Sequence, residues 1–77
     1  MNDQLAAGVW RHYKGQEYLV LGLARDDETD EPLVIYVRLY ARQGMPMSAR
    51  KLSVWNQTVQ HEGRTVARFE YVGHASL

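Results

Sequence analysis

The part of the sequence that most restricts the fold is residues 33–40, which read Leu-Val-Ile-Tyr-Val-Arg-Leu-Tyr. Three β-branched side chains in this run disfavour a helix, because a branched Cβ crowds the preceding turn, and they favour an extended strand. Alternate positions of a strand face opposite ways. One face of the expected strand is aliphatic and consists of Leu33, Ile35, Val37 and Leu39. The other face is amphipathic and partly aromatic, and consists of Val34, Tyr36, Arg38 and Tyr40.

Further strand patterns lie on both sides of this run, at residues 9–13, 17–25, 47–52 and 65–72. Residues 53–59 are ambiguous, because Val54 and Trp55 fit either a strand or a single helical turn. Short strands at this spacing, with no convincing amphipathic helix, predict an all-β fold. We expect a small, strongly bent antiparallel sheet or barrel of four to five strands, with Gly22 marking a bend. The expected core consists of Trp10, Tyr18, Leu21, Ile35, Val37, Leu39, Trp55 and Phe69.

The chain has 77 residues, which is room for one small domain. We expect this domain to span residues 1–77, with an ordered core at residues 8–72 and frayed ends. The absence of cysteine excludes a disulfide scaffold, a Cys-based zinc site, a thiol nucleophile and an iron–sulfur cluster. The first residues do not read as a signal peptide, and no apolar run approaches the roughly 20 residues of a membrane span. A cytoplasmic location without membrane contact is therefore expected.

The first half of the chain resembles a bacterial family of short proteins of unknown function. The resemblance rests on residues 8–15, which read Gly-Val-Trp-Arg-His-Tyr-Lys-Gly, and on the pattern Y.VLG.A…ET.E.LV.Y..LY that follows them up to Tyr40. It resumes weakly at Arg50 and at Arg68 and Phe69. The resemblance implies a small β-barrel of the SH3-like or Sm-like kind and implies no activity. Sm-like barrels commonly bind RNA and assemble through strand edges, and SH3-like barrels commonly bind peptides or nucleic acid.

The charges are segregated although the formal net charge is zero. Five of the nine acidic residues fall within residues 26–31, so the rest of the chain has five more bases than acids. A solvated turn is the simplest interpretation of this acidic segment, and a cation site or a contact for a basic partner are the alternatives. The segment lacks the glycine and glutamate spacing of an EF-hand loop, and His12, His61 and His74 show no metal-ligand spacing. We therefore expect no metal and no cofactor.

Motifs that would indicate catalysis are missing. Ser48, Ser53, Thr58 and Thr65 lie in no nucleophile elbow and have no histidine at a recognisable spacing. The six glycines form neither a Walker loop nor a dinucleotide-binding fingerprint. The sequence thus predicts no catalytic residues and a protein that is not an enzyme.

Cations and aromatic residues alternate around the first turn and along residues 36–40. This composition suits single-stranded nucleic acid, because cations follow phosphates and rings stack on bases. We therefore expect a non-catalytic binding module for RNA or single-stranded DNA. Ordinary rim packing by the rings and solubilising charge is the simpler alternative. The predicted binding residues are Arg11, His12, Tyr13, Lys14, Tyr18, Tyr36, Arg38, Tyr40, Arg50 and Lys51.

Three further possibilities concern partners. A protein-interaction module would use an aromatic peptide groove formed by Trp10, Tyr36, Tyr40 and Trp55, and the acidic segment would meet a basic partner. A small-molecule sensor would need a pocket in the barrel or at a dimer seam. Self-association is also expected, as a homodimer or a larger ring, because residues 33–40 or 65–71 could present an open strand edge.

Overall fold

The structure is a computed structural model that describes residues 4–74. The ends predicted to fray, at residues 1–3 and 75–77, lie outside the described residues. The described part contains one short helix and otherwise only strands and connections, and all strand pairs are antiparallel. In chain order the elements are β1 (Gly8–His12), β2 (Glu17–Arg25), β3 (Pro32–Arg38), β4 (Met47–Lys51), α1 (Leu52–Trp55), β5 (Thr58–His61), β6 (Arg64–Ala67) and β7 (Phe69–Gly73).

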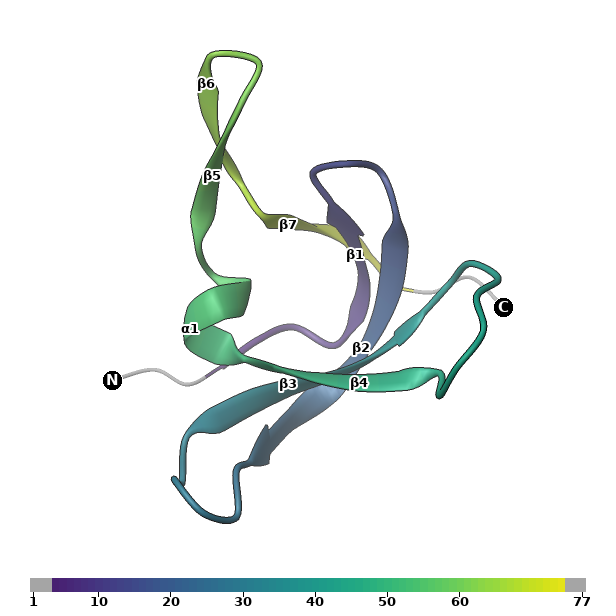
Figure 1. Ribbon diagram of the computed structural model, residues 1–77, viewed down its shortest axis with the longest axis vertical. Helices are drawn as coiled ribbons and strands as arrows, with labels where there is room; N and C mark the ends of the chain where they lie inside the picture. The colour runs from purple at the N-terminus through teal and green to yellow at the C-terminus, as the bar shows by residue number, and fades with distance from the viewer. Residues whose placement is uncertain (1–3, 75–77) are drawn as a thin grey trace.

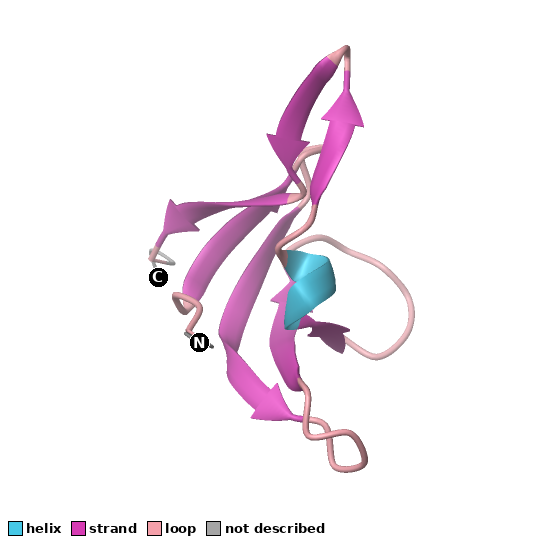
Figure 2. Cartoon of the chain, turned by 90° about the vertical axis from the view of Figure 1, so that its left-hand side faces the viewer, coloured by secondary structure: helices cyan, strands magenta, loops and turns pink. Residues whose placement is uncertain are grey.

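Five of these strands form one sheet in the order β4-β3-β2-β1-β7, and β5 pairs with β6 in a separate hairpin (Figure 1). The prediction of an all-β, antiparallel fold is therefore confirmed. The prediction of a closed barrel is not, because the edge strands β4 and β7 do not pair with each other. The sheet instead curves around α1 and stays open (Figures 1 and 2). Because β3 lies between β2 and β4, residues 33–40 offer no open edge, contrary to the prediction.

The single strand predicted at residues 65–72 is in fact two strands, β6 and β7, in two different sheets. Arg68 separates them. Its backbone N–H donates to the carbonyl of Gln57 at 3.0 Å, and its carbonyl accepts the N–H of Tyr13 at 3.0 Å. The backbone groups of Arg68 thus join the hairpin to the end of β1. The chain passes from one sheet into the other at this residue, and the sequence alternation of residues 65–72 continues across it without a break.

A bulge in β2 bends the sheet where Gly22 was expected to mark a bend. The pairing with β3 shifts register between Val20 and Gly22, and Gly22 has a φ of 153°, which favours glycine. Val20 pairs with Tyr36 before the bulge, and Leu23 pairs with Val34 after it. All four side chains therefore face the same, concave side of the sheet.

The core lies on this concave side. Its buried side chains are Val20, Val34, Tyr36, Leu52, Trp55 and Phe69. The predicted core was right for Trp55 and Phe69, and Trp10 and Tyr18 pack against it partly buried. It was wrong for Leu21 and Leu39, which are each 49% exposed, and Ile35 and Val37 lie on the same outer side, half-buried. The physical reason is that the amphipathic face of β3, not its aliphatic face, meets the aromatic rings.

The ambiguous segment around Trp55 forms a single helical turn, α1. The turn is closed by the N–H of Asn56, which donates to the Leu52 carbonyl at 3.0 Å. It places Trp55 on the concave side of the sheet. The indole stacks there on Phe69, with a centroid distance of 3.7 Å and an interplanar angle of 4°. Trp10 and Tyr36 contact the same indole edge-on, with centroids at 5.7 Å and 5.0 Å. These rings replace the second sheet that would otherwise cover the concave side.

Replacing Phe69 by alanine should therefore be costly. We expect Phe69→Ala to lower the free energy of unfolding by about 3–5 kcal/mol, because the substitution leaves a cavity under Trp55. The control Met45→Ala removes a side chain that is 87% exposed, and its effect should stay within about 0.5 kcal/mol. Urea unfolding followed by circular dichroism measures both. Equal stability of the two variants would show that the stacked rings do not hold the fold.

Candidate functional site

Aromatic side chains follow one another along the concave face of the sheet, from the end of β3 to the first turn. The ring of Tyr18 contacts those of Tyr40 and Phe69, with centroids 5.6 Å and 5.9 Å away. The imidazole of His12 then lies 5.1 Å from Phe69 and 4.5 Å from Tyr13. Five residues from β1, β2, β7 and two connections thereby form one continuous row, which we call the aromatic row.

Tyr18 and Tyr40 are joined by a hydrogen bond between their hydroxyl oxygens at 3.1 Å. Burial and this hydrogen bond raise the pKa of Tyr18 to about 12. The same bond lowers the pKa of Tyr40, because Tyr18 acts as donor to the ionised form. The Tyr18 hydroxyl therefore stays protonated near neutral pH and is available as an uncharged hydrogen-bonding group.

Arg50 lies over the middle of the aromatic row. Its Nε donates to the hydroxyl of Tyr36 at 3.3 Å, and its guanidinium carbon is 5.5 Å from the Phe69 ring centroid. This contact is a cation–π interaction. No carboxylate of the described residues lies within 4.0 Å of Arg50. The guanidinium is held in place by rings and a phenol, so its charge is not neutralised by an acidic partner.

Arg68 supplies a second unneutralised charge. Its Nη2 donates to Gln57 at 3.3 Å, while its Nε is buried with no acceptor among residues 4–74. No described carboxylate pairs with it. Arg68 was not among the predicted binding residues, because nothing in the spacing indicates that the chain crosses between sheets there.

The pKa of His12 responds to the positive charge of this region. Partial burial lowers its pKa below 6.5, and the cations Arg68, Lys14 and Arg50 lower it further, in that order. Nδ1 of His12 accepts the backbone N–H of Lys14 at 3.2 Å, so the neutral ring carries its proton on Nε2. Near neutral pH the imidazole is therefore an uncharged donor surrounded by three cations.

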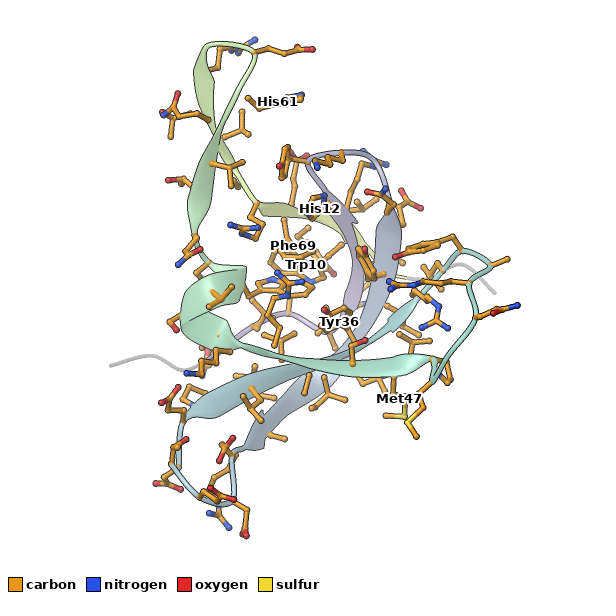
Figure 3. All side chains as sticks on the ribbon, viewed as in Figure 1. Trp10, His12, Tyr36, Met47, His61 and Phe69 are labelled. Atoms are coloured by element: carbon orange, nitrogen blue, oxygen red, sulfur yellow. The ribbon has the colours of Figure 1, made fainter. Side chains whose placement is uncertain are left out.

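A cleft with a volume of about 220 Å³ opens between the first turn and the β5–β6 hairpin. The ring of His61 forms an edge-on contact with Tyr13 there, with centroids 5.2 Å apart, and Figure 3 shows His61 on the hairpin above His12. His61 was not among the predicted residues, because its proximity to residue 13 depends on the hairpin. The lining consists of Arg11, His12, Tyr13, His61, Val66, Ala67 and Glu70.

The structure brings some of the predicted binding residues together. The others are engaged in ion pairs or hydrogen bonds within the chain. His12, Tyr13, Lys14, Tyr18, Tyr36, Tyr40 and Arg50 belong to the concave region described above. Arg11 forms an ion pair with Glu17 at 2.8 Å, and Lys51 forms one with Glu31 at 3.6 Å. Arg38 donates to four backbone carbonyls of residues 42–45, so it organises that loop.

Two of the four residues predicted to form an aromatic peptide-binding groove lie in the core. Trp55 is 1% exposed and Tyr36 is 7% exposed. Their rings cannot contact a peptide without unfolding the region around α1. Trp10 and Tyr40 remain partly exposed, at separate places on the sheet.

The acidic segment forms a self-contained turn. Asp26 Oδ1 accepts the backbone N–H groups of Glu28 and Thr29 at 2.9 Å and 3.0 Å, and these bonds lower the pKa of Asp26. Arg25 lies within ion-pair distance of Asp27 and Asp30. Among residues 4–74 no group of three His, Asp or Glu side chains is placed to hold a metal ion. The described part of the chain also has no helix long and apolar enough to span a bilayer.

Fold and site together define a small all-β protein whose concave face carries aromatic rings and two arginines that have no acidic partner within residues 4–74. Residues 8–71 match the family model described as "Protein of unknown function (DUF1653)", and the chain belongs to this family. It is 57% identical to a protein of the same family from Bordetella bronchiseptica whose crystal structure is known. That structure matches with a TM-score of 0.88 over 95% of this chain and 94% of that chain. No curated protein matches this chain.

The family resemblance inferred from the first half of the sequence is thus confirmed. The match extends through the second half up to residue 71, where the resemblance read from the sequence was weak. It therefore covers β4, α1 and the hairpin, which supply Arg50, Trp55 and His61.

The charge around His12 should make stability depend on pH. Because the folded state lowers the pKa of His12 below its unfolded value of 6.5, the unfolded chain binds the proton more readily. The stability that neutral His12 contributes is full above about pH 6.5 and is lost as the pH falls through the lower, folded pKa. We expect urea unfolding midpoints to fall over this range and to fall less steeply in His12→Gln.

A direct titration of His12 by NMR checks the cause. We expect a pKa below 6.5 in the wild type and a higher value in Arg68→Gln, which removes the cation with the largest effect. Arg25→Gln, at the end of β2 beside the acidic turn, serves as the matched loss of an arginine and should leave the pKa of His12 unchanged. A wild-type value at or above 6.5 would contradict the positive environment described here.

Proposed function

We propose that this protein is a non-catalytic module that binds single-stranded nucleic acid along its concave face. The observation that carries the proposal is that Arg50 and Arg68 have no acidic partner among the described residues and lie beside the aromatic row. Guanidinium groups bind phosphate oxygens with paired hydrogen bonds. Partly exposed rings next to them can stack on bases.

The partly exposed rings at the two ends of the row are the proposed base contacts. Tyr13 and Tyr40 are both half-buried, so one face or edge of each ring is accessible. Stacking on such a ring is worth about 1–3 kcal/mol per base and tolerates any sequence. Phe69 and Tyr36 are buried and instead hold Arg50 in position. The arrangement favours binding with little base specificity.

The position of the acidic residues agrees with this proposal. The acidic turn lies at the tip of the β2–β3 ribbon, at the opposite end of the molecule from the β5–β6 hairpin (Figure 1). Glu17 is paired with Arg11, and Glu31 with Lys51. A polyanion lying along the aromatic row would therefore avoid most of the negative charge of the chain.

The fold supports the proposal by analogy. We infer that the bent five-stranded sheet is an open relative of SH3-like or Sm-like barrels, which commonly bind nucleic acid or peptides. The analogy is weaker evidence than the arrangement of Arg50 and Arg68, since one fold hosts many functions.

Fluorescence anisotropy with labelled single-stranded RNA and DNA tests the proposal. We expect weak binding that decreases with salt, with a slope of log K against log salt near −0.7 for each phosphate contact, so about −1.4 for two. The double variant Arg50→Gln/Arg68→Gln should lose most of this binding, whereas Arg25→Gln should retain it.

Two results would contradict the proposal. One is no salt-sensitive binding by wild-type protein at high micromolar concentration. The other is equal binding by Arg50→Gln/Arg68→Gln and Arg25→Gln, with circular dichroism confirming that all three proteins are folded. Either result would remove the concave arginines as phosphate contacts.

A further inference from the structure

The outer face of the five-stranded sheet, which is the side opposite α1, is apolar in its middle and carries the charged residues Arg11, Glu17, Lys51 and Glu70 at its margin. The strand registers place one row of four aliphatic or thioether side chains across it, from β1 to β4: Val9, Leu19, Val37 and Met47. A second row pairs Ile35 with Ala49 on one side and Gly22 on the other. Figure 3 shows Met47 on the opposite side of β4 from Tyr36.

Several side chains on this outer face expose about half of their surface. Met47 is 55% exposed and Leu21, at the bulge beside Gly22, is 49% exposed. Leu39, which follows β3 on the Val37 parity, is 49% exposed. Val72, the extra residue at the register shift between β7 and β1, is 46% exposed. A monomer seldom exposes a contiguous apolar patch of this kind unless the patch has a function.

The chain itself does not cover the outer face within the described residues. Leu5, near the N-terminal end, packs against the core, and α1 contacts the inner sides of β3 and β4 (Figure 2). The β5–β6 hairpin extends beyond the sheet and makes its ring contact with Tyr13 at the first turn. The aliphatic face of β3 therefore remains in contact with solvent in one copy.

The charges at the margin of this face indicate what covers it. Arg11 pairs with Glu17 and Lys51 with Glu31, so each outward-facing cation already has an anion beside it. Among the residues that the structure describes, this margin therefore offers no unpaired cation to nucleic acid or to an anionic membrane surface. It is instead compatible with a copy of itself, and the zero net charge of the chain means that two copies do not repel each other.

The size of the molecule is also compatible with a second copy. A stable interface buries about 800 Å² on each partner, and the molecule measures 37 × 30 × 24 Å with the β5–β6 hairpin included. We infer that the protein forms a two-fold dimer in which the outer faces of two sheets pack against each other. Leu21, Val37, Leu39 and Met47 lie in its centre, and the two ion pairs form its rim.

A symmetric dimer of this kind uses the same patch on both copies. Sheets packed face to face bury alternate side chains of each strand, about 10 Å apart. Both concave faces then point outward and remain open. The inference does not depend on the proposed nucleic-acid binding, because the two surfaces lie on opposite sides of the sheet.

Sedimentation velocity from low micromolar to millimolar concentration tests the dimer. We expect the wild type to reach about twice the 8.9 kDa mass of the chain and to keep that mass in high salt, since the contact is apolar. The double variant Leu21→Lys/Met47→Lys should halve the mass at every concentration. The control Asn56→Lys/Thr58→Lys adds the same charge at exposed positions near α1 and should remain dimeric.

A second pair of substitutions, Leu39→Lys/Val72→Lys, tests the same face at other exposed positions, so that a folding defect in one pair leaves the test intact. Circular dichroism identifies which variants are folded. The inference is overturned if the wild type stays at 8.9 kDa at millimolar concentration. It is also overturned if a folded variant with lysines on the outer face still dimerises, or if the control dissociates as well.

Discussion

The structure depends on the stacking of Trp55 on Phe69. A five-stranded sheet of this size has no second layer of its own, and the indole that α1 inserts into its open side provides one. Phe69 opens β7 directly after the chain crosses between the two sheets at Arg68, and Trp55 ends α1. The stacked pair therefore joins the last strand to the only helical turn of the described chain, and the sheet bends around it.

This contact also decides which face of β3 lies inside. The sequence predicts the strand, its alternation and the bend at Gly22 correctly, because these depend on local preferences. It does not predict the inner face, because alternation shows only that a face avoids water, not what it packs against. The aliphatic face that looked like the core is the outer one, and the face carrying Tyr36 meets Trp55.

The sequence likewise predicts only part of the candidate site. His12, Tyr13, Tyr18 and Tyr40 could be found because they belong to three of the strand patterns in the sequence. Arg68 and His61 could not, because no local signal marks the crossover at Arg68 or shows that the β5–β6 hairpin contacts the first turn. Arg38 was predicted to bind nucleic acid because it lies among the rings of residues 36–40. In the structure its guanidinium instead donates to four backbone carbonyls of the following loop.

The most direct test of the fold described here is methyl NMR on a sample dilute enough for the protein to be monomeric, containing a soluble paramagnetic agent. The agent broadens signals in proportion to their contact with solvent. The account predicts strong broadening for the methyl groups of Leu21, Leu39 and Met47, and sharp signals for Val20 and Val34. Sharp signals from the first three residues together with broadened signals from Val20 and Val34 would place the core on the other face of the sheet and contradict it.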